Sequence, residues 1–249
     1  MTMLVLFFSV SFAYNGIENL GNEDRFTLTQ DEIDGLLLMR EEEKLARDMY
    51  LKLYEIWGLE IFKNIANSEE SHTNAVKRLL DKYGIEDPMN VDEFGIFVDQ
   101  ELQELFDLLI EKGSKSLLDA LLVGATVEDL DIYDLQQLKE MTDKEDIIRV
   151  YNNLEKGSRN HMRSFMKLIE EQGGEYQAQF ISDEELKLIL STEMERGPYN
   201  ENWTQNLLSY TNEDDNHLEE ESLLEKEETI VDMNLFERFV QWMRNIFRG

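Results

Sequence analysis

The chain has 249 residues, and 42% of them are hydrophobic, which is enough for a sizeable core. Asp and Glu number 54 against 24 Lys and Arg, so the formal net charge is -30. This charge repels nucleic acid and anionic membrane surfaces and favours cationic ligands, although a solvated acidic surface has the same composition. Cysteine is absent, which excludes disulfides, thiolate metal sites, iron–sulfur clusters and cysteine nucleophiles.

Residues 1–27 form an apolar N-terminal segment and a lead-in to the first helix. The apolar run from Leu4 to Ala13 ends in a small-x-small pattern that would allow cleavage before Tyr14. No Lys or Arg precedes the run, and it is too short to span a bilayer as a helix. A weak export signal, an apolar arm packed on the domain and a misassigned start all stay open. Export and a cytoplasmic location are therefore both consistent with the sequence.

Capping motifs predict the first two long helices. Thr29-x-x-Glu32 is typical of a capping box, and it opens a predicted helix that runs to Gly58. A second helix is predicted from about Glu60 to the glycine stop at Gly84. The short connection between these helices predicts an antiparallel pair.

The middle segment 84–113 separates this pair from two further long helices. It contains a short predicted helix over 99–112. A third long helix is predicted over 114–140, and Thr142-x-x-Glu145 is expected to cap a fourth that ends before 173–174. Two antiparallel pairs joined by one long crossover between helices two and three predict an all-α fold. We expect a ferritin-like four-helix bundle, with a C-terminal extension.

Each predicted long helix carries an apolar stripe that polar residues interrupt near its middle. Glu41 and Glu42, which flank the stripe of the first helix, are expected to point elsewhere. Because the middles of antiparallel helices meet, the interrupting residues should converge at one depth. These residues are Glu43 on the first helix, Glu69 and His72 on the second, Glu128 and Asp131 on the third, and His161 on the fourth.

This set of side chains predicts a metal centre. Four carboxylates balance two divalent cations, and two imidazoles give each cation a nitrogen ligand. An unpaired buried carboxylate costs roughly several kcal/mol, so inward acids need a partner. The expected cofactor is two iron ions, with manganese or zinc as alternatives. In a competing interpretation, Arg40, Arg47 or Arg159 pairs with these acids, and the protein is a non-catalytic helical interaction or structural protein.

Four ordered motifs resemble the ferritin-like family called domain of unknown function 2202. The motifs occupy residues 41–50, 64–72, 124–132 and 157–161, and the likeness covers roughly residues 28 to 190. The resemblance implies a ferritin-like bundle and a di-iron site, and it carries no settled activity. It also implies that Glu69 and His72 form the bridging Glu-x-x-His motif, and that Glu43 and Glu128 are the single glutamates of the first and third helices.

One position departs from that pattern. The usual fourth helix also carries Glu-x-x-His, but the residue three before His161 is Ser158. Glu155 is expected to lie about 120° from the face of the histidine, so it is a poor substitute. Asp131 follows Glu128 by one turn and is expected to supply the missing carboxylate from the neighbouring helix.

The sequence therefore predicts a ferritin-like di-metal protein with an oxidase, peroxidase-type or ferroxidase activity that uses dioxygen or peroxide. Tyr50 follows Glu43 by two turns, where it could hydrogen-bond a ligand, carry an electron or only fill the core. No nucleic-acid partner is expected. The sequence leaves the organic substrate and assembly into a homo-oligomer undecided.

Three segments follow the fourth helix. Ser182-x-x-Glu185 is expected to cap a short helix to about Glu195, which completes a di-metal domain over 28–195. Residues 196–230 are expected to form a disordered acidic linker in which His217 is solvated. Residues 231–249 are predicted to form an amphipathic helix. That helix could dock on its own domain, bind a protein partner or bind a membrane surface.

Overall fold

The computed structural model describes residues 27–89 and 92–197, and within these ranges it contains six α-helices and no strand. The predicted all-α class is confirmed. The helices are α1 (Gln30–Trp57), α2 (Glu60–Tyr83), α3 (Gln100–Gly113), α4 (Leu117–Glu140), α5 (Glu145–Glu171) and α6 (Asp183–Ser191). None of these helices is both long and apolar enough to cross a membrane. The predictions for Leu4–Ala13, for His217 and for the helix over 231–249 lie outside the described residues.

The ends of α1 and α2 follow the predicted signals. The Thr29 hydroxyl accepts a hydrogen bond from the amide of Glu32, and the Glu32 carboxylate accepts one from the amide of Thr29. Gly58 and Gly84 end the two helices with φ values of 64° and 69°. That left-handed backbone favours glycine because a Cβ would clash there.

Three predicted helix ends are wrong. Thr142 does not cap α5, whose N-cap is Lys144; its hydroxyl accepts a hydrogen bond from the amide of Lys144 at 3.1 Å and donates one to Glu32 of α1 at 2.6 Å. The third long helix begins at Leu117, after a cap at Ser116, and not at residue 114. The last helix ends at Ser191 and not at Glu195. The backbone of Thr192, which follows it, is extended, and the Glu195 carboxylate pairs with Arg159 of α5.

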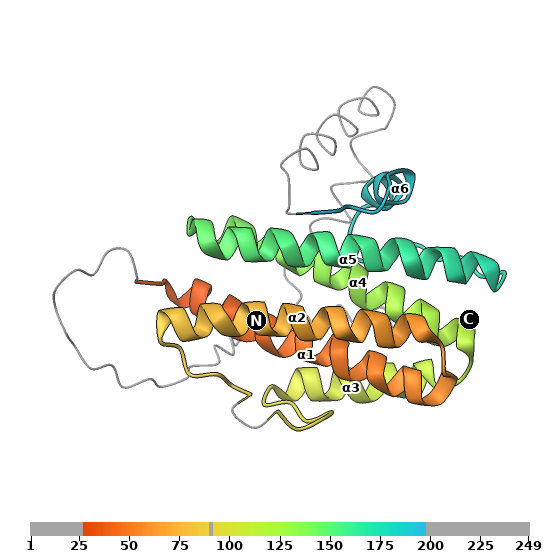
Figure 1. Ribbon diagram of the computed structural model, residues 1–249, viewed down its shortest axis with the longest axis horizontal. Helices are drawn as coiled ribbons and strands as arrows, with labels where there is room; N and C mark the ends of the chain where they lie inside the picture. The colour runs from red at the N-terminus through yellow and green to blue at the C-terminus, as the bar shows by residue number, and fades with distance from the viewer. Residues whose placement is uncertain (1–26, 90–91, 198–249) are drawn as a thin grey trace, which may run out of the picture.

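The helices are arranged as two pairs with additional short helices (Figure 1). α1 packs mainly against α2, and α4 packs mainly against α5. The pairs meet through contacts of α1 with α4 and of α2 with α5. α3, which lies in the long connection between the pairs, packs on α1 and α4, whereas α6 packs on α5. The polar middles of the four long helices are thereby brought to one region.

The apolar core is divided into two clusters, and each contains residues of all four long helices. One cluster includes Met49 and Tyr50 of α1, Phe62 of α2, Leu121 of α4 and Phe165 of α5. The other includes Leu36 and Met39 of α1, Val76 and Leu80 of α2, Leu135 of α4, and Tyr151 and Leu154 of α5. On α1, α2 and α5 the inward polar residues lie between the residues of the two clusters, and on α4 they precede Leu135 of the second cluster.

Candidate metal centre

Glu69 is at the centre of the polar region, because its carboxylate reaches both histidines. Oε2 of Glu69 lies 2.6 Å from Nδ1 of His72, one turn along the same helix. Oε1 lies 2.8 Å from Nδ1 of His161 on α5. The rings of the two histidines have their centroids 5.9 Å apart. One buried carboxylate therefore spans the space between two imidazoles.

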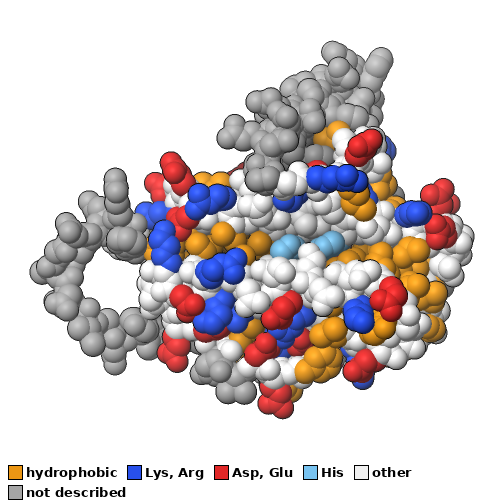
Figure 2. Space-filling model, in the orientation of Figure 1, with side chains coloured by type: hydrophobic (Ala, Val, Ile, Leu, Met, Phe, Trp, Pro, Cys, Tyr) orange, Lys and Arg blue, Asp and Glu red, His pale blue; other side chains and the backbone are white. Residues whose placement is uncertain are grey.

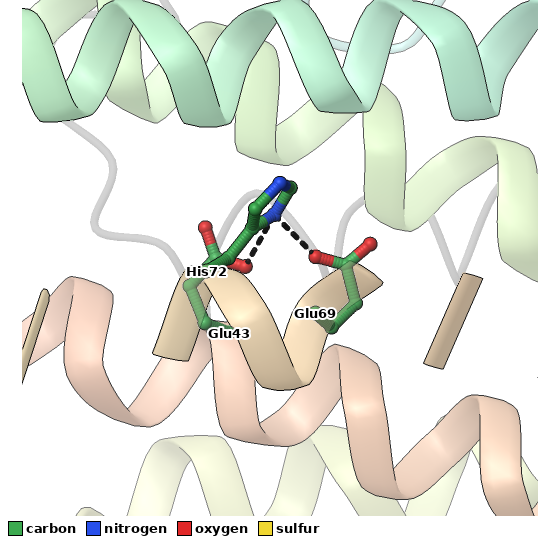
Figure 3. Close-up of side chains that lie close together, drawn as sticks. All are labelled: Glu43, Glu69 and His72. Carbon is green, nitrogen blue, oxygen red and sulfur yellow. Dashed lines mark hydrogen bonds and ion pairs between the residues drawn. The ribbon is translucent and has the colours of Figure 1, made fainter. Parts of the chain in front are cut away.

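A second carboxylate faces each histidine. Oε2 of Glu43 lies 3.2 Å from Nδ1 of His72, so that this nitrogen faces both Glu43 and Glu69 (Figure 3). Oε2 of Glu128 lies 3.2 Å from Nδ1 of His161. The site thus consists of two triads that share Glu69, and in each triad the three ligand atoms lie within 4.8 Å of one another.

The triads fit a pair of cations in their donor set and in their charge. Each Nδ1 carries at most one proton, yet two carboxylates face it, so the proton cannot satisfy both acceptors. Oε1 of Glu43 is buried without a hydrogen-bond partner among the described residues. A divalent cation bound by carboxylate oxygens and an imidazole nitrogen would satisfy these atoms. No Lys or Arg in the described part of the chain forms an ion pair with Glu43, Glu69 or Glu128.

The arginines of the competing interpretation have other acidic partners. Their ion pairs join Arg40 to Asp87, Arg47 to Asp48, Glu70 and Asp92, and Arg159 to Glu155 and Glu195. The pairs with Asp87 and Asp92 join α1 to the long connection between α2 and α3. The pair with Glu195 joins α5 to the residues after α6. These pairs do not supply the positive charge that balances the triads.

The close packing of acids and imidazoles changes their proton affinities. Burial alone would lower the pKa of His161, but Glu69 and Glu128 raise it to about 10. The pKa of His72 is likewise well above its usual range, because Glu69 and Glu43 outweigh burial. Burial alone would raise the pKa of Glu69, but the two imidazoles hold it below its usual range. Without metal, two imidazolium ions therefore balance much of the acid charge.

Tyr50 contacts a carboxylate of the second triad. Its hydroxyl lies 2.5 Å from Oε1 of Glu128 and 3.2 Å from the carbonyl oxygen of Gly124. Its ring stacks against Phe165, with centroids 5.5 Å apart. The hydroxyl donates to the carboxylate, so Tyr50 both fills the core and orients Glu128.

The structure does not bring Asp131 into either triad. Its carboxylate accepts a short hydrogen bond from Ser158, the residue three before His161. Burial raises the pKa of Asp131 to about 8, although the bond from Ser158 opposes this shift. Glu155 lies away from both triads, as expected, and pairs with Lys139 and Arg159.

The room that Gly157 leaves for His72 and the burial of the Glu42 carboxylate were not predicted. A Cβ on Gly157 of α5 would lie 2.5 Å from Cε1 and 2.7 Å from Nε2 of His72, so the missing side chain makes room for the imidazole. Glu42 points away from the triads, as expected, but its carboxylate is buried in another part of the interior. The phase of a residue on its own helix predicts neither feature, because both depend on which neighbouring helix packs against that residue.

The two histidines are the part of the site that is accessible to solvent. Their side chains are 13% exposed at His72 and 11% at His161, whereas the three glutamates are 2–3% exposed. Histidine atoms reach the surface about midway along the long helices, in the seam between α2 and α5 (Figure 2). Small molecules can therefore approach the triads from the histidine side.

Comparison with known proteins identifies the family of the chain. The family model described as "Uncharacterized protein domain (DUF2202)" matches residues 32–193. The uncharacterised protein MJ0754 of Methanocaldococcus jannaschii is 52% identical over 181 residues, which are 73% of this chain and 98% of that protein. The crystal structure of MJ0754, described there as a hypothetical protein, superimposes with a TM-score of 0.67 and covers 72% of this chain and 100% of its own.

Proposed function

Because the chain belongs to the DUF2202 family of uncharacterised protein domains, we propose its function from the geometry of its own site. The protein is a ferritin-like di-metal carboxylate protein that binds two iron ions, with manganese or zinc as alternatives. Its activity is of the oxidase, peroxidase or ferroxidase type, with dioxygen or peroxide as the oxidant. The two helix pairs and the long connection support a ferritin-like four-helix bundle.

The observation that carries this proposal is the position of Glu69 between two equivalent triads. A single carboxylate that faces two imidazole nitrogens is suited to bridge two cations. Glu43 and His72 would complete the shell of one ion, and Glu128 and His161 that of the other. When bound, two iron(II) ions would supply electrons for the reduction of dioxygen or peroxide.

The residues of the chain have separate roles in such a site. The carboxylates bind the cations and favour the oxidised state of iron, since they are hard, negatively charged ligands. Tyr50 donates to Glu128 and fixes the orientation of that carboxylate. The imidazoles must release their protons to bind, and the solvent-exposed edge of the site offers a path for those protons.

Metal analysis of reconstituted protein tests the binding step. We expect about two iron ions per chain after anaerobic loading and desalting, and substantially less in His72→Ala and in His161→Ala. His217→Ala, outside the described residues, is the histidine control and should keep two. Circular dichroism checks that each variant is helical. An iron content near zero in helical wild-type protein would contradict the proposal.

The redox step needs a separate measurement. Anaerobic ferrous protein is mixed with dioxygen or with peroxide, and ferric absorbance is followed by stopped flow. We expect at least one oxidant to react faster than with free ferrous ion, and faster than with His72→Ala. If neither does, while two ions are bound, the metal has only a structural role.

A non-catalytic helical interaction or structural protein is the second candidate, with one observation in its favour. The acids of both triads have partners within the chain, namely the two imidazoles. In that case the polar region is a permanent ion-pair network and needs no cation. Wild-type protein would then bind iron no better than the histidine variants.

A further inference from the structure

A small cavity with an apolar wall lies between α1, α3 and α4. Its volume is about 30 Å³. That is room for about two water molecules, or for one diatomic molecule. Leucines of all three helices contribute to the wall, for example Leu45 of α1, Leu105 of α3 and Leu130 of α4. The surface that a molecule would meet in this cavity is therefore mostly hydrocarbon.

The polar side chains of the wall offer little to a water molecule. Both carboxylate oxygens of Glu42 are buried, so they present almost no surface to the cavity. The hydroxyl of Thr126 donates to a carbonyl oxygen of its own helix. The carboxylate of Asp131 accepts a hydrogen bond from Ser158 of α5. A buried water needs roughly two to four polar partners, so this cavity favours a small apolar molecule over water.

The cavity adjoins the side of the proposed metal centre that α1 and α4 form. On α1, the wall includes Ala46, three residues after Glu43. On α4, it includes Asp131, three residues after Glu128. Three residues advance a helix by about 4.5 Å along its axis, so the wall begins within one turn of both carboxylate ligands.

The cavity and the accessible edge of the site lie on different sides of the four long helices. α3, which closes the cavity, packs on α1 and α4. The two histidines reach solvent in the seam between α2 and α5 (Figure 2). Polar molecules and protons therefore approach the triads from the seam, whereas the apolar cavity lies on the side of α3.

We propose that this cavity is a dioxygen site, in which the gas is held beside the metal centre. Dioxygen is small and apolar, so its transfer from water to a hydrocarbon wall is favourable. Peroxide would lose hydrogen bonds to water that the wall does not replace. A larger organic molecule exceeds the volume of the cavity. The inference rests on the proposed function, and it selects dioxygen over peroxide as the oxidant.

Krypton, an apolar gas close to dioxygen in size, tests the cavity without any metal. Crystals of metal-free wild-type protein are pressurised with krypton, and its anomalous scattering locates the bound atoms. We expect a krypton peak between Leu45, Leu105 and Leu130. A pressurised wild-type crystal without this peak would overturn the inference and leave the metal centre standing. This measurement does not depend on any variant.

A pair of variants of α3 tests whether the cavity supplies the metal centre. Leu105→Phe places a larger side chain in the wall, on a helix that carries no proposed ligand, and should abolish the krypton peak. Leu108→Phe is the matched control, because Leu108 lies on the same helix but does not line the cavity. It should keep the peak. Both variants should be helical and should bind two iron ions.

The oxidation rate of the ferrous variants is then followed by stopped flow. We expect the rate constant with dioxygen to fall about tenfold in Leu105→Phe, which is equivalent to about 1.4 kcal/mol, and to stay at the wild-type value in Leu108→Phe. Any reaction with peroxide should keep its wild-type rate in both variants, because peroxide approaches from the histidine side. A wild-type rate with dioxygen in a Leu105→Phe protein that takes up no krypton would refute the inference.

The results separate this inference from the proposed function. Ferrous protein that reacts with peroxide but not with dioxygen would overturn the dioxygen site and leave the metal centre standing. Krypton in the cavity of a protein that binds no iron would contradict the proposed function, and the supply of dioxygen to a metal would be refuted with it.

Discussion

Gly157→Ala should weaken metal binding by displacing His72. The added Cβ would lie 2.5 Å from Cε1 and 2.7 Å from Nε2 of the imidazole, whereas ordinary contact begins at 3.4 Å. The difference between 3.4 and 2.5 Å is 0.9 Å, which is the shift that the ring or α5 must make. Metal–ligand distances tolerate only about 0.2 Å. We therefore expect the affinity of the first triad to fall about 10- to 100-fold, the range typical of lost ligand positioning.

The stability of Gly157→Ala distinguishes displacement of His72 from general unfolding. Alanine in place of a helical glycine favours the helix by about 1 kcal/mol, so α5 itself gains. Metal-free Gly157→Ala should accordingly stay folded, with a melting temperature close to that of wild type. Metal affinity and helix stability then move in opposite directions, which general unfolding would not produce.

Gly35→Ala is the matched control. A Cβ on Gly35 of α1 would also come too near a side-chain atom, Cδ2 of Leu138 at 2.7 Å, but that methyl packs against an apolar cluster and not against the triads. Isothermal titration with Fe²⁺ or Co²⁺ under anaerobic conditions measures the affinities of both variants. Wild-type affinity in Gly157→Ala, or an equal loss in Gly35→Ala, would refute the positioning role of Gly157.

Two further predictions follow from the buried charges. His161, whose pKa is about 10, and Asp131, whose pKa is about 8, hold protons that the unfolded chain releases near pH 6.5 and 3.9, so the melting temperature of metal-free protein should fall as the pH rises from 7 to 10. A constant or rising melting temperature in the presence of chelator would show that these protons are not held. Glu155→Gln breaks buried ion pairs with Lys139 and Arg159, so the free energy of unfolding should fall by roughly 3 kcal/mol while the iron content stays unchanged. Urea titration and metal analysis measure the two quantities, and loss of iron without loss of stability would place Glu155 in the site.

The sequence predicted the features that depend on local rules. The capping box predicted the start of α1, and glycine stops predicted the ends of α1 and α2, because these signals act within one turn of helix. Helical phase placed Glu43, Glu69, His72, Glu128 and His161 on inward faces, and the structure brings all five together. That convergence could be expected because antiparallel helices of similar length meet at their middles.

The features that depend on packing between helices could not be predicted. Thr142 has the spacing of a cap, but its hydroxyl accepts from the amide of Lys144, before the helix begins, and donates to a carboxylate of α1. Gly157 is an ordinary helical glycine until α2 places an imidazole against it. The same holds for Asp131, whose inward phase is compatible with a triad or with Ser158. Such choices are decided by side chains of other helices, which a single helical pattern does not contain.

The division of the core explains how the chain tolerates a cluster of acids at its centre. Each apolar cluster includes residues of all four long helices, for example Leu36 and Leu80 on one side of the triads and Phe62 and Phe165 on the other. The helices are therefore held together on both sides of the polar region without a cation between them. In the metal-free protein, the imidazolium ions of His72 and His161 balance the charge of the acids, so the chain can fold before a metal ion binds. Metal binding then exchanges protons for cations in a preformed site, and its affinity should rise with pH until the imidazoles are neutral.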